Sequence, residues 1–420
     1  MHILFYNLFL YFYALGIRLA ALFNPKARLW LEGRKNIFEK LSSVIAGNTA
    51  PLVWFHCASL GEFEQGQPLM KAYKTQYPEH KILLTFFSPS GYEVQKNDKN
   101  ADYIFYLPMD SRPSAKKFLS ITKPALIIFI KYEYWYYFIT EIKEKKMPFL
   151  LVSAIFRKEQ PFFQWYGKLH KYMLQCFTHF FLQNQLSAKL LEKIEINNFT
   201  VSGDTRFDRV LAIKNSNETL PEIAQFCENK KVIVAGSTWS ADDEVLGLYA
   251  NTHPEIRFII APHELSEERL QECEKRYCHV VFYSGYIKGN IALDNINTLI
   301  IDNIGMLSKL YRYATVCYVG GGFGGDGVHN VLEAAVYAKP VIFGPVYEKY
   351  DEAVNLINSG GGISVEDAPE LKEELNNLLN DAASYAAASQ AAGNYVLQNG
   401  GATERVMNYI FSNHFIQNAQ

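Results

Sequence analysis

Residues 52–64, LVWFHCASLGEFE, decide the fold. An apolar run of strand length leads through a turn of small residues into a segment of helical length. From residue 50 onward the chain repeats this order, so that short apolar runs alternate with amphipathic helical stretches. The alternation predicts parallel sheets flanked by helices, in which ligands bind beside the carboxyl ends of the strands.

The apolar runs fall into two sets. In the first half we predict strands at 52–57, 81–86, 103–107, 125–130, 148–152, 179–182 and 199–202. In the second half we predict strands at 231–235, 257–261, 279–282, 298–301, 315–319 and 340–343, and closing helices at 381–392 and 402–411. A chain of 420 residues is too long for one ordinary core. We therefore expect an α/β protein with two Rossmann-like, doubly wound domains that face each other across a cleft.

The polar stretch 214–222 separates the two sets of strands. Its Asn, Ser and Pro residues are typical of a linker. We expect a membrane anchor with a basic flank at 1–35, a first domain at 36–213, a linker at 214–229, a second domain at 230–395 and a closing helix at 396–420.

The composition limits the class of protein. Hydrophobic residues make up 49% and charged residues 20% of the chain, which are globular values. A formal net charge of -2 gives no global reason to expect a nucleic-acid partner, so any anionic ligand must be recognised locally. The cysteines are scattered through apparent core segments, which indicates reduced thiols in the cytoplasm.

The N-terminus departs from this soluble pattern. The apolar run from Ile3 to Phe23 contains one charged residue, Arg18, near its end, and is long enough to cross a membrane. The basic residues that follow would stay on the cytoplasmic side; they are Lys26, Arg28, Arg34 and Lys35. The run predicts an anchor to the cytoplasmic membrane surface. An amphipathic helix docked on the protein or lying in the membrane interface is the alternative.

Glu62 lies at the start of the helix that follows the first strand. A carboxylate there can project into a cleft as a general base, and the backbone N–H groups of Gly61 and its neighbours can meet an anionic group. The alternative is an acidic residue that only complements the helix dipole. Glu64 is expected to face solvent.

The segment FIKYEYW at 129–135 follows another apolar strand and places Lys131 and Glu133 at its carboxyl end. A cleft-lining carboxylate with a lysine close by can orient a sugar hydroxyl. A surface ion pair between the two side chains is the competing interpretation.

The glycine-rich stretch GGGFGGDG at 320–327 follows a predicted strand and precedes a helix that we expect to begin near His329 or Asn330. Glycines allow a backbone to approach a phosphate closely, and a helix N-terminus favours its negative charge. Asn330 and Glu333 would share one face of that helix, where the carboxylate could accept both hydroxyls of a ribose. The alternative is a flexible loop before an ordinary helix.

Two further turns of the second half lie at predicted strand ends. AGSTW at 235–239 offers Ser237 and Thr238, which would donate to a phosphate or only cap the next helix. APHE at 261–264 offers His263, which would contact a nucleotide or serve only the structure.

Five segments, in this order, resemble the landmarks of the 3-deoxy-D-manno-octulosonic acid (Kdo) transferase family. They are HCASLGE at 56–62, KYEYW at 131–135, VSGDTRFD at 201–208, AGST at 235–238 and GGGFGGDGVHNVLE at 320–333. The apolar N-terminus with its basic flank resembles that family too. The resemblance covers nearly the whole chain, and five ordered motifs are far more specific than any one alone.

The resemblance implies a GT-B fold and an inverting transfer of Kdo from CMP-Kdo to a phosphorylated lipid A precursor of the lipid IVA type, at the cytoplasmic face of the inner membrane. It assigns the base to Glu62, with Glu133 as a second catalytic candidate, and acceptor binding in the first domain to Ser59, Gly61 and Lys131. Donor binding falls to the second domain, with candidates Ser237, Thr238, Pro262, His263, Ile304, Gly305, Gly321, Gly322, Gly324, Asn330 and Glu333. No cofactor and no metal are expected, because the leaving group is a monophosphate and the sequence has no D-x-D motif.

Two positions depart from the family pattern. Many members have E-T-E where this chain has Lys131-Tyr132-Glu133, so only the second carboxylate carries over. A family P-R-H segment appears here as Pro262-His263-Glu264, and imidazole lacks the forked charge of arginine.

Three other functions compete with this interpretation. Another GT-B transferase could use a nucleotide-diphosphate sugar, although a retaining enzyme is disfavoured because Val341 stands where such enzymes carry a second glutamate. A nucleotide-sugar 2-epimerase shares the fold but needs no N-terminal anchor. A noncatalytic scaffold would be expected to lack Glu62 or the glycine-rich stretch, and both are present.

Overall fold

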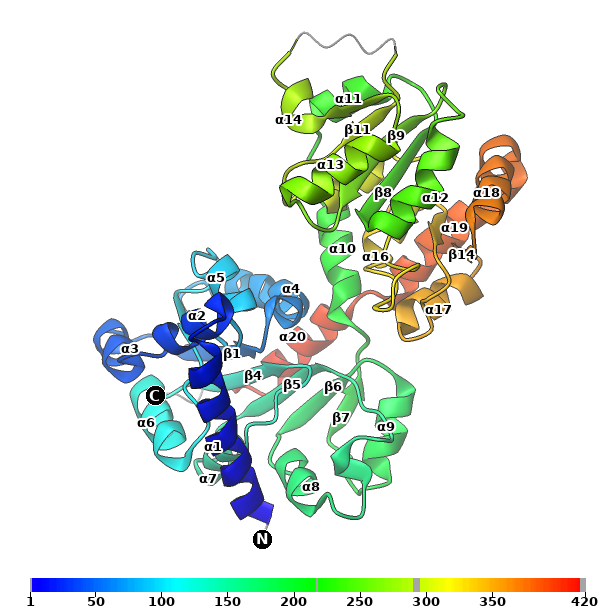
Figure 1. Cartoon of the computed structure of the whole chain (residues 1–420). Coiled ribbons are helices and arrows are strands. Elements are labelled where there is room, and N and C mark those ends of the chain that lie inside the picture. The colour runs from blue at the N-terminus through cyan, green and yellow to red at the C-terminus, as the bar shows by residue number, and fades with distance from the viewer. Residues whose placement is uncertain (1, 217, 290–294, 416–420) are drawn as a thin grey trace. The chain divides into compact units, whose positions relative to one another are not determined.

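The computed structural model describes residues 2–216, 218–289 and 295–415 and divides the chain into two compact units. The first unit runs to Arg209 and includes the C-terminal segment from Gly401 onward, and the second spans Val210–Gly400. Each unit is a parallel sheet with helices on its faces (Figure 1). This architecture is that of GT-B proteins.

The first sheet has the strand order β3-β2-β1-β4-β5-β6-β7, and every neighbouring pair is parallel. Its strands are β1 (Leu52–Cys57), β2 (Lys81–Phe86), β3 (Tyr103–Tyr106), β4 (Leu126–Ile130), β5 (Phe149–Ala154), β6 (His179–Leu182) and β7 (Phe199–Val201). Helices cover both faces, which explains why the central strands are apolar throughout rather than alternating. Trp54 of β1 packs among α6 and α7 on one face, whereas Phe55 packs with α4 and α20 on the other.

The helices of the first unit come from both ends of the chain. They are α1 (His2–Ala20), α2 (Pro25–Gly33), α3 (Ile37–Ile45), α4 (Leu60–Gln76), α5 (Pro89–Gln95), α6 (Arg112–Thr122), α7 (Tyr136–Glu144), η1 (Pro161–Phe163), α8 (Lys168–Leu174), α9 (Gln185–Glu192) and α20 (Ala402–Ser412). Asp208 fixes the return of the chain, because its carboxylate accepts hydrogen bonds from the backbone N–H groups of Gly401 and Thr403. Val406 and Ile410 of α20 then complete the core beside α4.

The second sheet has the order β10-β11-β9-β8-β12-β13-β14 and is also parallel throughout. Its strands are β8 (Val232–Thr238), β9 (Arg257–Pro262), β10 (Val280–Phe282), β11 (Thr298–Ile300), β12 (Val316–Val319), β13 (Val341–Phe343) and β14 (Gly362–Ser364). Its helices are α11 (Pro221–Cys227), α12 (Ser240–Ala250), α13 (Glu267–Arg276), α14 (Tyr283–Tyr286), α15 (Leu307–Leu310), η2 (Tyr311–Tyr313), α16 (Leu332–Ala335), α17 (Asp351–Asn358), α18 (Ala368–Asn380) and α19 (Ala382–Asn399). Helix α10 (Thr205–Asn215) runs across the boundary between the units.

Every strand predicted from the sequence is present within a few residues, and the two parallel sheets are confirmed. Two features differ from expectation. The edge strand β14 was not predicted, because its three residues follow a run of glycines and form no apolar run of their own. The helix after the glycine-rich stretch begins at Leu332 and has four residues, because residues 327–330 form an irregular segment.

Helix α1 docks on the first unit by one side. The Tyr6 hydroxyl donates to Asp110 at 2.6 Å and accepts from the backbone N–H of Tyr136 at the start of α7. Tyr137 donates to Asn7, and Leu10 is buried. The docked-helix alternative therefore describes this side of α1. The opposite side is exposed and apolar, and the window Ile3–Ala20, with a mean hydropathy of 1.5, is long and apolar enough to cross a membrane.

Candidate functional site

Each sheet has a central point where the strand order reverses. In the first sheet this point lies between β1 and β4, and in the second it lies between β8 and β12. Crossovers leave in opposite directions there, which opens a crevice at the carboxyl ends of the strands where ligands bind in such folds. The motifs around Glu62, Glu133, Ser237 and Gly321 follow or end these four strands.

Glu133 belongs to a buried hydrogen-bond network at the first of these points. Its Oε2 atom lies 2.7 Å from His56 Nε2 and accepts from Trp135 Nε1 at 2.6 Å. On the other side of the imidazole, Thr85 Oγ1 lies 2.8 Å from His56 Nδ1 and accepts from Trp54 Nε1. Nδ1 also lies 3.0 Å from the carbonyl oxygen of Thr85, so the imidazole is held between two oxygens of Thr85 on one side and Glu133 on the other. Glu133 is thus a fixed, buried carboxylate rather than half of a surface ion pair.

Glu62 lies in the first turn of α4 and folds back over the helix start. Its Oε2 atom accepts hydrogen bonds from the backbone N–H of Ser59, at 3.1 Å, and from the Ser59 hydroxyl. This is half of a capping box, and it holds the carboxylate in one orientation. The side chain is half-buried, in contrast to that of Glu133.

The two carboxylates converge on the end of β1. Burial, together with the charges of Glu62 and Glu133, raises the pKa of the Cys57 thiol well above its usual range. Gly61 is exposed beside them, a Cβ there would meet Ser59 Oγ at 3.9 Å, and its N–H in the first turn has no partner within the helix. Lys131 has a left-handed backbone, and its ammonium group lies 5.1 Å from the centre of the Tyr132 ring.

In the second unit a buried aspartate fixes the glycine-rich stretch. Asp242 accepts hydrogen bonds from the backbone N–H groups of Gly321 and Trp239, at 2.9 and 2.8 Å, and from the Tyr318 hydroxyl. Burial raises the pKa of Asp242, and these donors oppose the shift. The Gly321 N–H is therefore used inside the protein, whereas a phosphate contact was expected of it.

Close backbone packing explains why positions 320 and 322 are glycines. A Cβ on Gly320 would lie 2.4 Å from the carbonyl oxygen of Ser237, and a Cβ on Gly322 would lie 2.5 Å from the nitrogen of Gly344. Such distances exclude any side chain. Gly324 and Gly325 form the accessible part of the loop and have no comparable clash.

A cavity of about 220 Å³ brings five of the expected donor-binding residues together: Ser237, Pro262, His263, Ile304 and Gly305. It lies at the carboxyl ends of β8 and β9. Asn303 is also in its wall and was not singled out from the sequence. Thr238 points elsewhere: its side chain is buried, and its hydroxyl finds no hydrogen-bond partner in the described part of the chain.

Three aromatic rings stack beside this cavity. The rings of Trp239 and His329 both contact that of His263, with centres 4.7 and 4.3 Å from its own and 6.4 Å from each other. Trp239 Nε1 donates to His329 Nε2 at 3.0 Å, which requires an unprotonated nitrogen. Burial, and next the neighbouring His263, lower the pKa of His329 to about 4, so this ring is neutral at physiological pH.

Asn330 and Glu333 are neighbours, as expected. The Asn330 side-chain amide donates to Glu333 Oε1 at 3.3 Å, and its carbonyl oxygen accepts from the backbone N–H of Leu332. The glutamate also lies near the buried Tyr311, whose pKa is raised by burial, by Cys317 and by Glu333.

Sequence reasoning missed three residues that shape these sites. His56 was quoted in a motif but given no role, although a histidine inside an apolar strand indicates a buried partner. Asp242 is one of two adjacent aspartates at a helix start, and both are fully buried. Trp239 gave no signal, because its contact with His329 joins positions 90 residues apart.

Comparison with known proteins identifies relatives of this chain. The model of the family described as 3-deoxy-D-manno-octulosonic-acid transferase (kdotransferase) matches residues 35–209. A bifunctional glycosyltransferase/methyltransferase of Fusobacterium nucleatum is 28% identical over 343 residues, which are 78% of this chain and 53% of that protein. A 3-deoxy-D-manno-octulosonic acid transferase of Aquifex aeolicus is 27% identical over 344 residues, which are 79% of this chain and 87% of that protein.

Among solved structures, the fold resembles a putative UDP-N-acetylglucosamine 2-epimerase from Listeria monocytogenes. The TM-score is 0.62 at 13% identity, and the match covers 87% of this chain and 97% of that one. At this identity the likeness concerns the fold alone.

Proposed function

Because the chain belongs to the 3-deoxy-D-manno-octulosonic acid transferase family, we propose that it transfers Kdo from CMP-Kdo to a lipid A precursor of the lipid IVA type in lipopolysaccharide biosynthesis. The observation that carries the proposal is the pair of carboxylates, Glu62 and Glu133, at the reversal point of the first sheet. An acceptor hydroxyl needs such a group to take its proton.

In the proposed reaction Glu62 is the general base. Its Oε1 atom takes the proton as the acceptor hydroxyl oxygen bonds to the anomeric carbon of Kdo, while the bond from that carbon to the CMP phosphate breaks. Ser59 holds Oε2 and keeps the carboxylate in place. Glu133, fixed by His56 and Trp135, orients the acceptor as a hydrogen-bond acceptor, and Lys131 offers charge to its phosphate.

The second unit would hold the donor. We assign the cavity around Ser237 and His263 to the phosphate end of CMP-Kdo, and Glu333 to the two ribose hydroxyls. The stack of Trp239, His263 and His329 supports this assignment, because it fixes the His263 ring at the rim of the cavity. The Gly324 N–H donates to the carbonyl oxygen of Gly321 at 2.9 Å, so Gly324, like Gly321 and Gly322, shapes the loop that would lie against the donor.

Product analysis tests the proposal. Purified protein would be incubated with CMP-Kdo and a tetraacylated lipid A precursor, and the product would be weighed by mass spectrometry. We expect a mass increase corresponding to one or more Kdo residues. Transfer from a nucleotide-diphosphate sugar instead, or epimerisation of UDP-N-acetylglucosamine, would show that the protein catalyses another reaction.

Activity is expected to survive chelation. CMP is a monophosphate and needs less charge neutralisation on departure than a diphosphate, and the sequence has no D-x-D motif. Initial rates with and without EDTA should agree within about twofold. A large loss in EDTA that magnesium restores would contradict this expectation.

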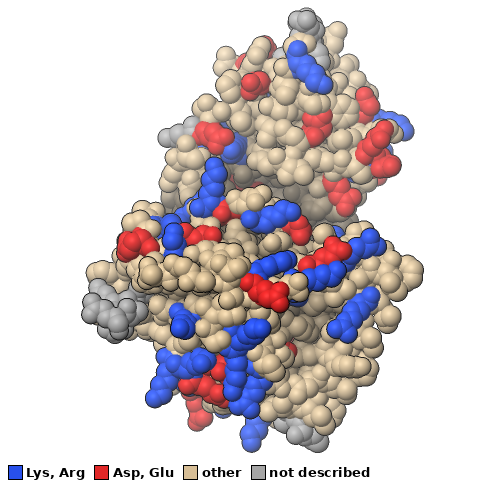
Figure 2. Space-filling view, turned by 90° about the vertical axis from the view of Figure 1, so that its left-hand side faces the viewer, with Lys and Arg blue, Asp and Glu red and all other residues tan. Residues whose placement is uncertain are grey.

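Helix α1 would place the enzyme at the cytoplasmic face of the inner membrane. Its exposed side carries large apolar residues, among them Leu4, Phe5, Phe9 and Phe12. Lys and Arg side chains gather on the first unit in the face shown in Figure 2, and they would favour an anionic lipid surface. Arg34 is not part of this basic surface, because its guanidinium donates to the carbonyl oxygens of Leu107 and Phe87.

Phe9→Gln is expected to weaken binding to anionic phospholipid vesicles by roughly tenfold, because a side chain that is 60% exposed would no longer enter the lipid. Vesicle co-sedimentation measures this effect. Phe411→Gln on α20 is the matched control, since Phe411 is 54% exposed and lies outside α1. Equal sedimentation of the two variants would contradict a membrane contact through α1.

A further inference from the structure

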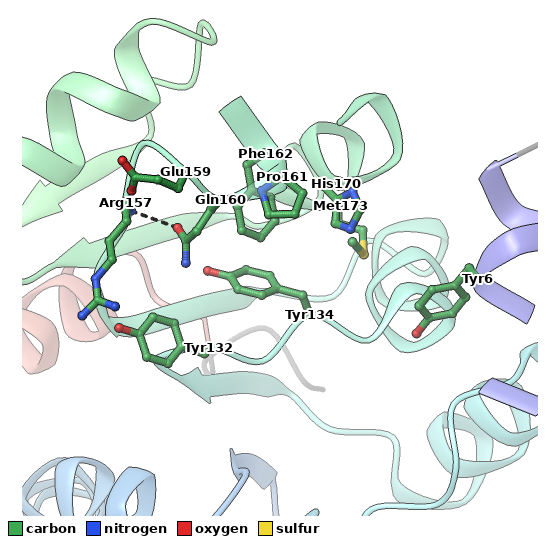
Figure 3. Close-up of a pocket in the computed structure, with 10 residues that line it drawn as sticks. All are labelled: Tyr6, Tyr132, Tyr134, Arg157, Glu159, Gln160, Pro161, Phe162, His170 and Met173. Atoms are coloured by element: carbon green, nitrogen blue, oxygen red, sulfur yellow. Dashed lines mark hydrogen bonds between the residues drawn. The ribbon is translucent and has the colours of Figure 1, made fainter. Parts of the chain in front are cut away.

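A larger cavity, of about 810 Å³, lies in the first unit beside the KYEYW segment (Figure 3). Aromatic side chains form much of its wall, namely Tyr6 of α1, Tyr132, Tyr134 and Phe162. Its volume falls in the range of sites that enclose small organic ligands.

One short segment joins this cavity to the carboxylate site. Successive side chains of an extended segment point to opposite sides. Glu133 accordingly turns inward to His56, while Tyr132 and Tyr134, on either side of it in the sequence, line the cavity. A ligand held in the cavity would therefore lie next to the segment that carries Glu133.

The Tyr134 hydroxyl is buried and has no hydrogen-bond partner among the residues that the structure describes. It points towards the end of the cavity where Arg157 and Gln160 lie (Figure 3). A buried hydroxyl without a partner is costly, so this one indicates a polar atom supplied by a ligand.

Arg157 brings a positive charge to the same end of the cavity. Arg157 is exposed, and within the described ranges its guanidinium forms no ion pair. Glu159, the acidic residue of the wall, turns its carboxylate away from the cavity (Figure 3). An anionic group would thus meet an arginine and a hydroxyl donor, the combination that favours a phosphate or carboxylate.

The opposite end adjoins α1, and Met173 and His170 lie in the wall on that side (Figure 3). Tyr6 forms the wall there, and its hydroxyl is already bound to Asp110. Ile3 and Phe9, about one turn away on either side of Tyr6, are exposed. The cavity therefore meets α1 on its docked side, next to exposed apolar residues of the same helix.

We propose that this cavity binds an acyl chain of the glycolipid acceptor, with the chain towards α1 and an anionic group of the same molecule at Tyr134 and Arg157. The inference rests on the proposed function, which supplies an acylated, phosphorylated acceptor. The acyl chain and its anionic group would then be recognised by the enzyme in addition to the acceptor sugar.

Binding of alkyl phosphates to the full chain tests the ligand class without any turnover. Calorimetric titration with tetradecyl phosphate should show binding, and decyl phosphate should bind more weakly, by about fourfold for each methylene that leaves the cavity. Tetradecanol should bind more weakly than tetradecyl phosphate, and inorganic phosphate should not bind measurably. Equal affinity for the long and short chains would overturn the proposal.

Two variants with matched controls locate the site. Tyr134→Phe should weaken the binding of tetradecyl phosphate about tenfold, because a hydrogen bond to a charged group is lost. The melting temperature of this variant should not fall, because the hydroxyl has no hydrogen-bond partner in the described part of the chain. Arg157→Gln should weaken the binding of tetradecyl phosphate about threefold. Tyr166→Phe and Lys158→Gln alter exposed neighbours outside the cavity wall and should have no effect. Equal effects of variants and controls would overturn the proposal.

Activity then identifies the natural ligand. Tyr134→Phe should reduce, by about tenfold, the ratio of kcat/KM for the phosphorylated, acylated acceptor to that for the same acylated molecule without its phosphates. Weaker alkyl phosphate binding with an unchanged ratio would mean that the cavity holds another lipid, and would overturn the inference. A chain that transfers no Kdo but binds alkyl phosphates as described would overturn the proposed function and support the ligand class of the cavity.

Discussion

Glu62→Gln is expected to lower the rate of Kdo transfer by about 10²- to 10⁴-fold, the usual contribution of a positioned general base. The amide cannot take a proton, but its oxygen can still accept the hydrogen bond from the Ser59 backbone N–H. The start of α4 should therefore be preserved, and affinity for CMP, which we assign to the other unit, should change little. Initial rates at saturating donor and acceptor measure the effect.

Glu64→Gln is the neighbouring control. Its carboxylate lies at the surface and accepts from Arg209 at 3.0 Å, so its replacement should alter turnover by less than about twofold. If Glu62→Gln keeps more than about a tenth of the wild-type rate with an unchanged melting profile, the base is another residue. Glu133→Gln is then the variant to measure, because an amide oxygen at that position can still accept from His56 and Trp135.

The sequence was sufficient for the sheets because both are buried on two faces. Such strands are continuous apolar runs, and 52–57, 81–86 and 179–182 were predicted to the residue. Strand β14 was not predicted because it is an edge strand of three residues, Gly362–Ser364. It forms by pairing with β13, and its own composition does not indicate a strand. Its place in the sheet depends on a contact that no local pattern reveals.

The candidate sites were predictable where a residue's role follows from its position after a strand. Glu62, Ser237 and His263 are of this kind. The partner of Glu133 was not predictable, because His56 lies 77 residues away and meets it only when β1 and β4 become neighbours. Here the sheet order, rather than the sequence motif, determines the environment of the carboxylate.

The glycine-rich stretch shows a limit of reading motifs as ligand sites. A run of glycines at a strand end predicts a phosphate loop, but Gly320 and Gly322 are required by packing against Ser237 and Gly344. Asp242 takes the N–H of Gly321. The sequence could not separate these roles, since close packing of backbone on backbone and close approach of a phosphate both demand the absence of a side chain.

Glu333→Ala is expected to weaken CMP binding by about 100-fold or more. Hydrogen bonds to a charged acceptor contribute about 1.5 to 3 kcal/mol each, and the proposed carboxylate accepts from two ribose hydroxyls. Glu333→Gln should have an intermediate effect, because it keeps the contact with Asn330 but removes the charge. Glu348→Ala, an exposed glutamate of the same unit, is the control and should bind CMP as the wild type does.

Comparison of two nucleotides separates this role from a general disturbance of the site. The wild type should prefer CMP to 2′,3′-dideoxy-CMP, which lacks both hydroxyls, and in Glu333→Ala most of this preference should disappear because its acceptor is gone. Calorimetric titration of both nucleotides into both proteins gives the coupling free energy between Glu333 and the ribose hydroxyls directly. Equal loss of affinity for the two nucleotides would mean that Glu333 acts through the fold of α16, and wild-type affinity for CMP in the variant would reject the assignment altogether.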